Sequence, residues 1–538
     1  MVRFVVLIAF LAAIKIVSCD TGICPNCQAS QTNCSPDSDQ TPFFGESCAV
    51  CDTVVSSEHR DIMPSCQLVQ TSPSLWLRNY NLGHLSSTDV SHLKHLRNLY
   101  VEPGDIRHLE NNTFDGFQHL YNLSLSRNKL TYVGKRWLVD VSGHLNLAHN
   151  EIAYIENEAF GNNDRCHMTV ALHLPWNKLE VIESGYLRHL CKVIFLDLRY
   201  NKIHTIDKGS FHDLHSLRIL RLAGNNLKVV RDFWFPAFKR QRLLFYLDLA
   251  QNRIHYIESE AFVNLLLLGD LDLSDNQITS LQENQFRIGS WNNRVWGSIK
   301  LKVKGNFFRC TCSLRWFIQS VLNCNAEFSD LKLLTCSYPE SLRGVKLTEL
   351  SYATTLSMQC PEPKVTIGTT ADGKTFQCEM YWEEGPPKIQ WTLPNYTNII
   401  ITDVSFEEGQ NIYLGDLNFT TSFYMNPKGF TCCNSTLLDY SKLRNNTHNF
   451  VGKAVSSLTV SPVILQKWRG ELVFCSLLFG SGETNITAHL NVTDLSHSLN
   501  SDDIITTMSY TLTETKTLTE TRKGNDEIIY IMDSDVSG

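Results

Sequence analysis

The chain carries a short pattern of leucines and asparagines that recurs between residues 123 and 278. Each copy has an asparagine that stands three residues after one leucine and five after another, at Asn128, Asn150, Asn177, Asn201, Asn225, Asn252 and Asn276. A leucine or isoleucine follows each of these asparagines, the asparagine ladder, by two residues. The alternation in the Leu-x-Leu step places both leucines on one side of a short strand. The pattern therefore predicts one short strand per copy, with its leucines in the core.

The distance between the asparagines identifies the kind of repeat. Successive ladder asparagines are 22, 27, 24, 24, 27 and 24 residues apart, within the range of about 20–29 residues of leucine-rich repeats. An asparagine amide both donates and accepts, so stacked asparagines can satisfy the open backbone groups of neighbouring turns. Weaker copies begin at Leu75 and Leu99. We therefore expect an α/β solenoid, a leucine-rich repeat horseshoe of about ten turns, over residues 71–305.

Composition and charge limit the classes of partner. The chain has 538 residues and a formal net charge of −7, which argues against nucleic acid or an anionic membrane surface as the main partner. The sequence motifs of zinc metalloproteases, serine hydrolases and P-loop nucleotide-binding proteins are absent. We therefore expect a protein with no enzymatic activity, no cofactor and no small-molecule substrate.

The two ends of the chain bear on its compartment. Residues 1–19 have the form of a secretory signal peptide, with Arg3, an apolar run over 4–14 and Cys19 before the cleavage position. No other stretch reaches the roughly 18 apolar residues of a membrane-spanning helix. The polar C-terminal residues also exclude the hydrophobic tail of a lipid-anchor signal. The sequence therefore predicts a secreted, extracellular protein.

Nine N-x-S/T sequons agree with an extracellular glycoprotein. They begin at Asn33, Asn111, Asn122, Asn395, Asn418, Asn434, Asn445, Asn485 and Asn491. Asn122 occupies an outward position on its predicted strand. A glycan at Asn122 would therefore shield the N-terminal part of the concave face.

Six cysteines in residues 20–70 indicate an N-terminal cysteine-rich cap: Cys24, Cys27, Cys34, Cys48, Cys51 and Cys66. Two C-x-x-C pairs also fit a zinc site, but disulfides are favoured in a secreted chain. The connectivity among six cysteines cannot be read from the sequence. Further along, Cys166 and Cys191 lie at similar offsets beyond successive ladder asparagines. Adjacent turns would bring them close, so we expect a disulfide between them.

Four cysteines follow the last repeat within residues 306–360, at Cys310, Cys312, Cys336 and Cys360. The segment CTCSLRWFIQSVLN, which begins at Cys310, has the apolar spacing of a short amphipathic helix. No histidine or second close cysteine pair is at hand to complete a metal site. The arrangement resembles the C-terminal cap of extracellular leucine-rich repeat proteins. That resemblance implies pairing of the first cysteine with the fourth and the second with the third, as Cys310–Cys360 and Cys312–Cys336.

Residues 361–494 show a different pattern and resemble an immunoglobulin domain. By this resemblance Cys378 lies on strand B, Trp391 on strand C and Cys475 on strand F. The disulfide Cys378–Cys475 would join two facing sheets of an all-β sandwich, and the tryptophan would pack against it. The sequence departs from the family pattern at Val473, where a tyrosine is usual, and in the long separation of the two cysteines.

Three cysteines and the C-terminal segment are left after these assignments. Cys324, Cys432 and Cys433 have no assigned partner, and their odd number leaves a free thiol or a disulfide-linked homodimer open. A non-covalent homodimer is the other oligomeric form that the sequence allows. Residues 495–538 are rich in threonine and show no apolar period. We expect them to form a disordered tail.

The order of signal, cysteine cap, repeats, cysteine cap and one immunoglobulin-like domain resembles the extracellular leucine-rich repeat/immunoglobulin family. The family includes Kekkon-like and LINGO-like proteins and the ectodomains of Trk neurotrophin receptors. The strings NFFRCTCSLRW and LRNLYVE are similar to the Trk versions, but Trk ectodomains have fewer repeats and a second immunoglobulin domain. The family binds proteins, commonly through the concave repeat face or the immunoglobulin domain. The resemblance therefore implies an extracellular or cell-surface protein as partner.

The repeat register shows which side chains face the concave side. Strand positions two, four and six residues before each ladder asparagine point away from the core. In the central repeats these positions hold His173, Phe195, Asp197, Arg199, Arg221, Tyr246 and Asp248, and Trp176 and Tyr200 lie at the edge. Tyrosine, tryptophan and arginine are enriched in binding hot spots. We interpret these residues as a candidate protein-binding surface, although polar residues are expected on any concave sheet.

Three functions fit these features. The leading one is a secreted or shed recognition protein of the receptor, adhesion or decoy type. The alternative is the ectodomain of a membrane receptor, Trk-like or of the neuronal adhesion type, whose transmembrane segment is absent from this isoform or fragment. The third is a structural matrix protein, which would be insoluble without reductant.

Overall fold

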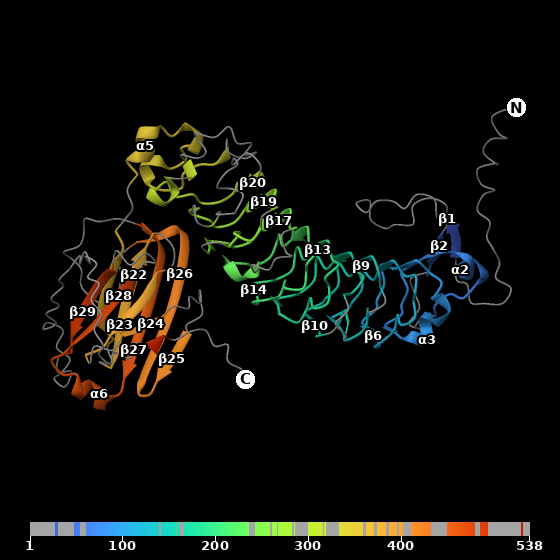
Figure 1. Cartoon of the computed structure of the whole chain (residues 1–538), viewed down its shortest axis with the longest axis horizontal. Coiled ribbons are helices and arrows are strands. Elements are labelled where there is room, and N and C mark those ends of the chain that lie inside the picture. The colour runs from blue at the N-terminus through green and yellow to red at the C-terminus, as the bar shows by residue number, and fades with distance from the viewer. Residues whose placement is uncertain are drawn as a thin grey trace.

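The computed structural model of the chain shows a long curved solenoid followed by a unit of two packed sheets (Figure 1). It describes residues 27–30, 48–53, 61–138, 141–157, 159–161, 166–235, 243–258, 261–265, 267–281, 285, 300–315, 317–318, 333–358, 362–370, 374–383, 387–394, 398–401, 410–431, 449–478, 485–492 and 529–530. The predicted signal peptide, Cys24, Cys34, Cys324, Cys360, Cys432 and Cys433 lie outside these residues.

A single 12-stranded sheet lines the concave side of the solenoid (Figure 1). Its strands, in spatial order, are β1 (Cys27–Ser30), β2 (Cys48–Asp52), β3 (Ser74–Arg78), β5 (Asn98–Val101), β7 (Asn122–Ser124), β9 (His144–Asn146), β11 (Ala171–His173), β13 (Phe195–Asp197), β15 (Ile219–Arg221), β17 (Tyr246–Asp248), β19 (Asp270–Asp272) and β20 (Lys300–Lys302). β1 runs antiparallel to β2, and the later neighbours are parallel. The two weaker repeat copies form β3 and β5. Equivalent leucines lie side by side, as Leu196 does with Leu220.

On the outer side of the solenoid, the repeats from β3 to β17 continue as a short strand or a short helical segment. The paired strands are β4 (His84–Leu85) with β6 (His108–Leu109), β8 (Tyr132–Val133) with β10 (Tyr154–Ile155), β12 (Val181–Ile182) with β14 (Thr205–Ile206), and β16 (Val229–Val230) with β18 (Tyr256–Ile257). The helical elements are α2 (Gln67–Thr71), α3 (Ser87–Val90), η1 (Ser91–Leu93) and η2 (Asp232–Trp234). Phe114, Phe160, Phe211 and Phe262 fill the space between this side and the leucines, each at most 2% exposed. The apolar core therefore runs unbroken along the solenoid.

Each ladder asparagine joins its own turn to the preceding one. Asn201 Nδ2 donates to the carbonyl oxygens of Leu174 at 3.0 Å and Leu198 at 3.1 Å. Asn201 Oδ1 accepts from the backbone nitrogen of Leu179 at 3.1 Å. Asn225 makes the same set of bonds one turn later. One buried amide thus satisfies backbone groups that would otherwise lie unpaired in an apolar core.

Disulfides occur in the N-terminal cap and inside the repeats. Cys27 bonds to Cys51, with Cα atoms 4.0 Å apart, and Cys48 and Cys66 are also disulfide-bonded. These described cysteines therefore form disulfides and not a zinc site. Cys166 bonds to Cys191, with Cα atoms 5.4 Å apart.

The disulfide pairing that the family resemblance implied for the C-terminal cap is wrong. Cys310 bonds to Cys336, with Cα atoms 5.6 Å apart, and not to Cys360. The reason is a backbone bridge between Arg309 and Tyr338, reinforced by the Cys310 nitrogen donating to the Tyr338 carbonyl at 2.7 Å. This bridge places Cys336 beside Cys310, so Cys312, which is also disulfide-bonded, cannot pair with Cys336. The described helical elements of this cap are η5 (Cys312–Leu314), η7 (Glu340–Leu342), η8 (Leu347–Glu349) and α5 (Tyr352–Leu356).

The second unit consists of two five-stranded sheets. One contains β21 (Lys364–Thr369), β22 (Thr375–Trp382), β27 (Asn449–Val460), β26 (Leu417–Thr431) and β25 (Gln410–Leu414) in that order, and the other β29 (Asn485–Asn491), β28 (Leu472–Leu478), β23 (Lys388–Thr392), β24 (Asn398–Ile401) and β30 (Ile529–Tyr530). A short helix, α6 (Pro462–Lys467), precedes β28. The disulfide Cys378–Cys475 connects the sheets. Trp391 is fully buried, and its Nε1 donates to Ser456 Oγ at 2.8 Å.

The C-terminal segment is not wholly without structure, contrary to the predicted disordered tail. Strand β30 pairs in parallel with β24, with Ile399 beside Ile529 and Ile400 beside Tyr530. β24 would otherwise be the edge of its sheet, with backbone groups open to a further strand. A short apolar stretch near the end of the chain satisfies them, which a composition dominated by threonine does not reveal.

A buried ion pair connects the C-terminal cap to the two-sheet unit. Arg309 Nε donates to Glu383 Oε1 at 2.7 Å and Nη2 to Oε2 at 3.0 Å. The two side chains are 1% and 3% exposed. The Tyr338 ring covers the guanidinium, with 3.9 Å between Cζ and the ring centroid, and Thr311 Oγ1 donates to the same carboxylate at 3.4 Å. Two groups this well buried stay charged only when paired, so the contact ties the two parts together.

Removal of a ladder amide tests its role in joining the turns. Asn201→Ala leaves buried carbonyl and amide groups of two turns without partners, so we expect the free energy of unfolding to fall by about 3 kcal/mol. Denaturant unfolding measures the loss. The matched control is Asn226→Ala, because Asn226 is half-buried and makes a 3.4 Å bond to the Lys202 carbonyl. Equal losses in the two variants would contradict the role assigned to the ladder.

Loss of the Glu383 carboxylate tests the connection between the two parts. Glu383→Ala leaves the Arg309 guanidinium buried without its counter-ion, so we expect destabilisation of about 3–5 kcal/mol. Glu340→Ala is the control, since Glu340 pairs with Arg343 at the surface, where the side chains are 83% and 66% exposed, and should cost less than about 1 kcal/mol. Calorimetric unfolding compares the variants. A loss for Glu383→Ala no larger than for Glu340→Ala would rule out a stabilising buried pair.

Candidate functional site

Two rows of side chains cross the middle of the concave sheet. The strand register aligns Ala171, Phe195, Ile219 and Tyr246 in one row and His173, Asp197, Arg221 and Asp248 in the other. Six of the predicted binding residues therefore lie together on four adjacent strands, β11 to β17. Their neighbours along the sheet are His144 and Asn146 on β9 and Asp270 and Asp272 on β19.

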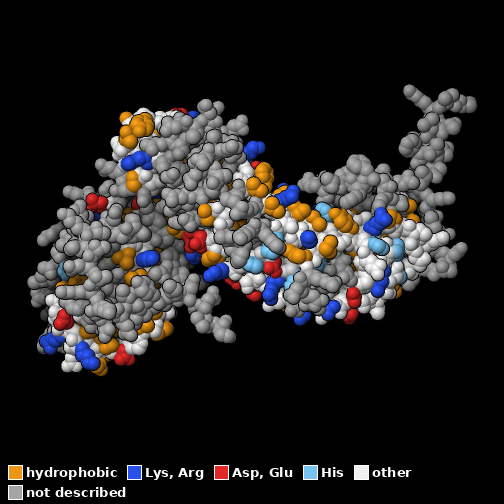
Figure 2. Space-filling view, viewed as in Figure 1, with side chains coloured by type: hydrophobic (Ala, Val, Ile, Leu, Met, Phe, Trp, Pro, Cys, Tyr) orange, Lys and Arg blue, Asp and Glu red, His pale blue; other side chains and the backbone are white. Residues whose placement is uncertain are grey.

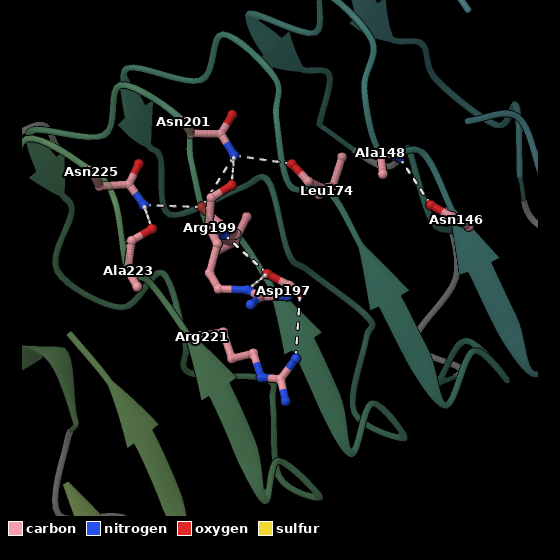
Figure 3. Close-up of polar contacts among 10 residues, drawn as sticks. Asn146, Ala148, Leu174, Asp197, Arg199, Asn201, Arg221, Ala223 and Asn225 are labelled. Atoms are coloured by element: carbon pink, nitrogen blue, oxygen red, sulfur yellow. Dashed lines mark hydrogen bonds and ion pairs between the residues drawn. The ribbon is translucent and has the colours of Figure 1, made fainter. Parts of the chain in front are cut away.

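Asp197 holds two guanidinium groups in place at the centre of this surface. Its carboxylate accepts from Arg199 Nη2 at 2.7 Å and lies 3.9 Å from Arg221 Nη1 (Figure 3). The Asp197 side chain is 3% exposed, whereas those of Arg199 and Arg221 are 32% and 34% exposed. Asp197 therefore positions the two arginines and offers little surface of its own, so its direct contact with a partner stays a prediction. Asp248 is also buried.

Ring systems continue the surface towards the N-terminus. The Arg221 guanidinium lies over the Phe195 ring, with 5.0 Å between Cζ and the centroid. The Phe195 ring is 4.9 Å from that of His173, and the His173 ring is 6.5 Å from that of His144. His144 was not among the predicted residues, although its position six residues before Asn150 has the outward register. Tyr121, 41% exposed, extends the series at 5.9 Å from His144.

Burial keeps the two histidines of this series neutral. It lowers the pKa of His173 to about 4, and the Asp197 carboxylate opposes this shift only in part. Burial also lowers the pKa of His144. Near neutral pH the positive charge of the central surface therefore comes from Arg199 and Arg221 alone.

Towards the C-terminal end of the concave sheet, acidic side chains on β17 and β19 are followed by basic ones on β20. Burial raises the pKa of Asp248. Beyond it, Lys302 Nζ lies 3.7 Å from Asp270 Oδ1 and 3.2 Å from Asp272 Oδ2. Neighbouring strands thus neutralise most of the charge at this end. The partly exposed aromatic and arginine side chains of the concave face therefore lie on β13 to β17, with Arg199 just after β13.

Trp176 and Tyr200 lie at the edge of the sheet, each directly before a ladder asparagine. Trp176 is 51% exposed. Its ring stacks on that of Tyr200, with centroids 4.3 Å apart, and on that of His149, at 5.7 Å. These three rings form a strip that is separate from the side chains of the concave strands.

The glycan predicted at Asn122 does not fit the structure. Asn122 is 6% exposed, and its Nδ2, the atom that would carry the glycan, donates to Asn98 Oδ1 at 2.7 Å. A polar row formed with Ser74 buries this amide, which the register alone does not show. The shielding of the N-terminal concave face that we expected from this glycan is therefore absent. Of the other sequons, Asn111 and Asn491 are exposed and Asn418 is half-buried. Asn33, Asn395, Asn434, Asn445 and the side chain of Asn485 lie outside the described part of the chain.

Among the described residues, no group of three or more histidine, cysteine, aspartate or glutamate side chains could hold a metal ion. In the same part of the chain, no helix has the length and apolarity needed to cross a membrane.

Comparison with known proteins shows that the chain contains leucine-rich repeats. The leucine-rich repeat family model matches residues 94–152, 170–227 and 237–287. No match is found among curated proteins. These repeats cover the strands that carry the concave surface.

Several solved structures are similar over the solenoid. A chain of the octameric complex of Latrophilin 3, Unc5D and FLRT2 is 25% identical, covers 55% of this chain and 80% of its own length, and has a TM-score of 0.41. Human 5T4 is 20% identical, with coverage of 57% and 100% and a TM-score of 0.40. Toll from the Drosophila Toll–Spatzle complex is 19% identical, with coverage of 58% and 48% and a TM-score of 0.42. This chain thus spans about half of the matched Toll chain.

The depressed pKa of His173 predicts a pH dependence of stability. Folding favours the neutral imidazole, because its pKa falls from 6.5 to about 4. The resulting stabilisation is complete above the unfolded pKa and is lost as the pH falls from about 6.5 towards 4. We expect the free energy of unfolding to drop between about pH 7 and 5, and His173→Phe to reduce that drop by about 1–2 kcal/mol. Urea unfolding at several pH values measures it, and identical drops in both proteins would contradict the assignment.

Proposed function

We propose that this protein is an extracellular recognition protein that binds a partner protein through the concave face of its repeats. The observation that carries the proposal is the set of partly exposed side chains on β13 to β17, namely Phe195, Arg199, Arg221 and Tyr246. These side chains combine aromatic area with two oriented guanidinium groups. Asp197 and the ring series hold them in place before any partner arrives, which lowers the entropic cost of binding.

The two-sheet unit supports the interpretation of residues 361–494 as an immunoglobulin-like domain. Cys378 on β22 and Cys475 on β28 belong to different sheets, and Trp391 on β23 pairs directly with Cys475. A disulfide between sheets with a buried tryptophan beside it is the usual centre of such a domain. We propose that this domain is a second region for contact with proteins, held to the repeats by the Arg309–Glu383 pair.

The extracellular location is part of the proposal. Disulfides at Cys27–Cys51, Cys166–Cys191, Cys310–Cys336 and Cys378–Cys475 persist in an oxidising compartment. Exposed sequon asparagines such as Asn111 are accessible to glycosylation. The alternative, a membrane receptor ectodomain, differs by a spanning segment outside this sequence, and a longer transcript that encodes one would favour it. A disulfide-linked homodimer remains open within either form.

Substitution of the concave side chains tests the proposal. The wild-type chain, fused to an antibody Fc region, is screened against a panel of extracellular proteins, and its main partner is then measured with the triple variant Phe195→Ala, Arg221→Ala and Tyr246→Ala. We expect affinity to fall by at least about 100-fold, because aromatic and arginine residues dominate hot spots. The control is Tyr413→Ala, since Tyr413 is 70% exposed and its strand, β25, belongs to the two-sheet unit and not to the concave sheet.

Two outcomes of this measurement are distinguishable. Loss in the triple variant with retention in Tyr413→Ala supports the concave surface. Full affinity in the triple variant, with its loss in Tyr413→Ala, would place the contact on the two-sheet unit and contradict the proposal.

A further inference from the structure

The residue directly before each ladder asparagine adopts an unusual backbone conformation. Arg127, His149, Trp176, Tyr200, Gly224, Gln251 and Asp275 all have a positive φ between 53° and 70°. Asn79 and Gly305, at the equivalent positions before Tyr80 and Asn306, have φ values of 62° and 71°. The turn geometry therefore imposes the left-handed region on this position whatever residue occupies it. Glycine and asparagine tolerate that region, whereas bulky side chains are strained there.

Three consecutive turns place rings at this strained position. His149, Trp176 and Tyr200, the edge strip, have φ values of 53°, 57° and 54°. The fold does not require rings, because Asn79, Gly224 and Gly305 meet the same demand elsewhere. Local strain that the fold does not need is a feature of functional sites.

The edge strip remains open to solvent even though its rings stack on one another. The interplanar angles are 7° between His149 and Trp176 and 19° between Trp176 and Tyr200. The free face of Tyr200 lies against Gly224, where a Cβ would approach the ring to 2.4 Å. The ring faces are thus largely covered within the row. Trp176 is nevertheless 51% exposed, so stacking alone does not explain a tryptophan there.

Basic side chains surround the edge strip. Within three residues of the ladder asparagines from Asn128 to Asn225, the chain has six basic residues, Arg127, Lys129, Lys178, Arg199, Lys202 and Lys228, and two acidic ones, Glu151 and Glu180. Glu151 and Lys178 pair with each other at 2.6 Å, so their two charges cancel. Figure 2 shows hydrophobic and histidine side chains exposed among lysines and arginines along the solenoid. Ring edges carry partial positive charge. The rings, like the lysines and arginines, therefore favour negatively charged groups on a partner.

We infer that the edge strip is a contact site for an acidic protein segment, in which aspartate or glutamate side chains flank an apolar one. The acidic groups pair with the lysines beside the strip. The apolar group rests on Trp176 next to the small side chains of Ala148 and Pro175 in the adjoining row. The inference rests on the proposed protein-binding function and adds the chemistry of the partner and a second contact surface beside the concave strands.

Peptides that bind the immobilised full chain are selected from a random-peptide display library. The affinities of synthetic copies of the enriched peptides are then measured for the wild-type chain and its variants. The key variant is Trp176→Asn with Tyr200→Asn, because asparagine accepts the left-handed backbone and should leave the melting temperature nearly unchanged. The charge variant is Lys129→Glu with Lys202→Glu, since both lysines are exposed beside ladder asparagines and neither belongs to the Glu151–Lys178 pair. The control is Phe245→Ala, since Phe245 is also an exposed ring, at 58%, and lies over Gly269 on the other side of the strand.

We expect the enriched peptides to be rich in aspartate and glutamate around an apolar residue. Their affinity should fall by at least about tenfold in each edge-strip variant, remain unchanged in Phe245→Ala and weaken with added salt. Enriched peptides without acidic residues, no enrichment at all, or equal affinity for the asparagine variant would overturn the inference. Binding of heparin that depends on the same lysines but not on the rings would also overturn it, in favour of a sulfated glycan.

The same reagents separate this inference from the proposed function. If the main partner requires Phe195, Arg221 and Tyr246 but ignores the edge-strip variants, the concave proposal stands and the edge strip is not a contact site. If neither the concave variant nor the edge-strip variants change the affinity for the partner, both the proposed function and this inference are wrong. Dependence on both sets supports a partner that extends from the concave strands over the edge.

Discussion

The buried asparagine amide of each turn is the interaction on which the rest of the solenoid depends. Each turn of the repeat must bend inward at the same point, and the bend exposes backbone groups to an apolar core. The ladder asparagine satisfies groups of its own turn and of the preceding one, as Asn201 does with Leu198 and Leu174. An isolated turn lacks the bonds to a preceding turn, so each turn of the solenoid is stabilised by its neighbours. The first and last turns lack one neighbour and therefore need caps.

This one contact also determines what the protein can present to a partner. Because it fixes the register between turns, equivalent positions line up into straight rows along the concave sheet. Side chains in a row touch their counterparts, which produces the series from His144 through His173 and Phe195 to Arg221. The same bend imposes a positive φ on the preceding residue, so the edge strip and the ladder have a common geometric origin.

Much of the repeat architecture follows from the sequence, because a period of leucines and asparagines reports contacts between neighbours in the chain. The register of β11 to β17, the outward rows and the Cys166–Cys191 bridge depend only on that period. Features that depend on contacts distant in sequence were missed or wrong. The Arg309–Tyr338 bridge changes the pairing of Cys310, and the Arg309–Glu383 pair spans two separate parts of the chain.

The sequence pattern also does not predict which side chains of an outward-facing row are buried. Asp197 and Asn122 have the outward register, yet neighbouring side chains cover both. Register tells which way a side chain leaves the strand, whereas exposure depends on the size and charge of the residues on adjacent turns. The candidate surface was thus predicted from the register, and the structure divides it into partly exposed residues and buried ones that support them.

The central claim is that a protein partner docks on the concave face of the central repeats. Hydroxyl-radical footprinting of the full chain, alone and with its main partner bound, tests it directly, since exposed aromatic side chains react readily. The account predicts that the partner protects Phe195 and Tyr246 and leaves the exposed Tyr413 and Tyr424 of the two-sheet unit unchanged. Protection confined to Tyr413 and Tyr424, with Phe195 and Tyr246 still reactive, would contradict it.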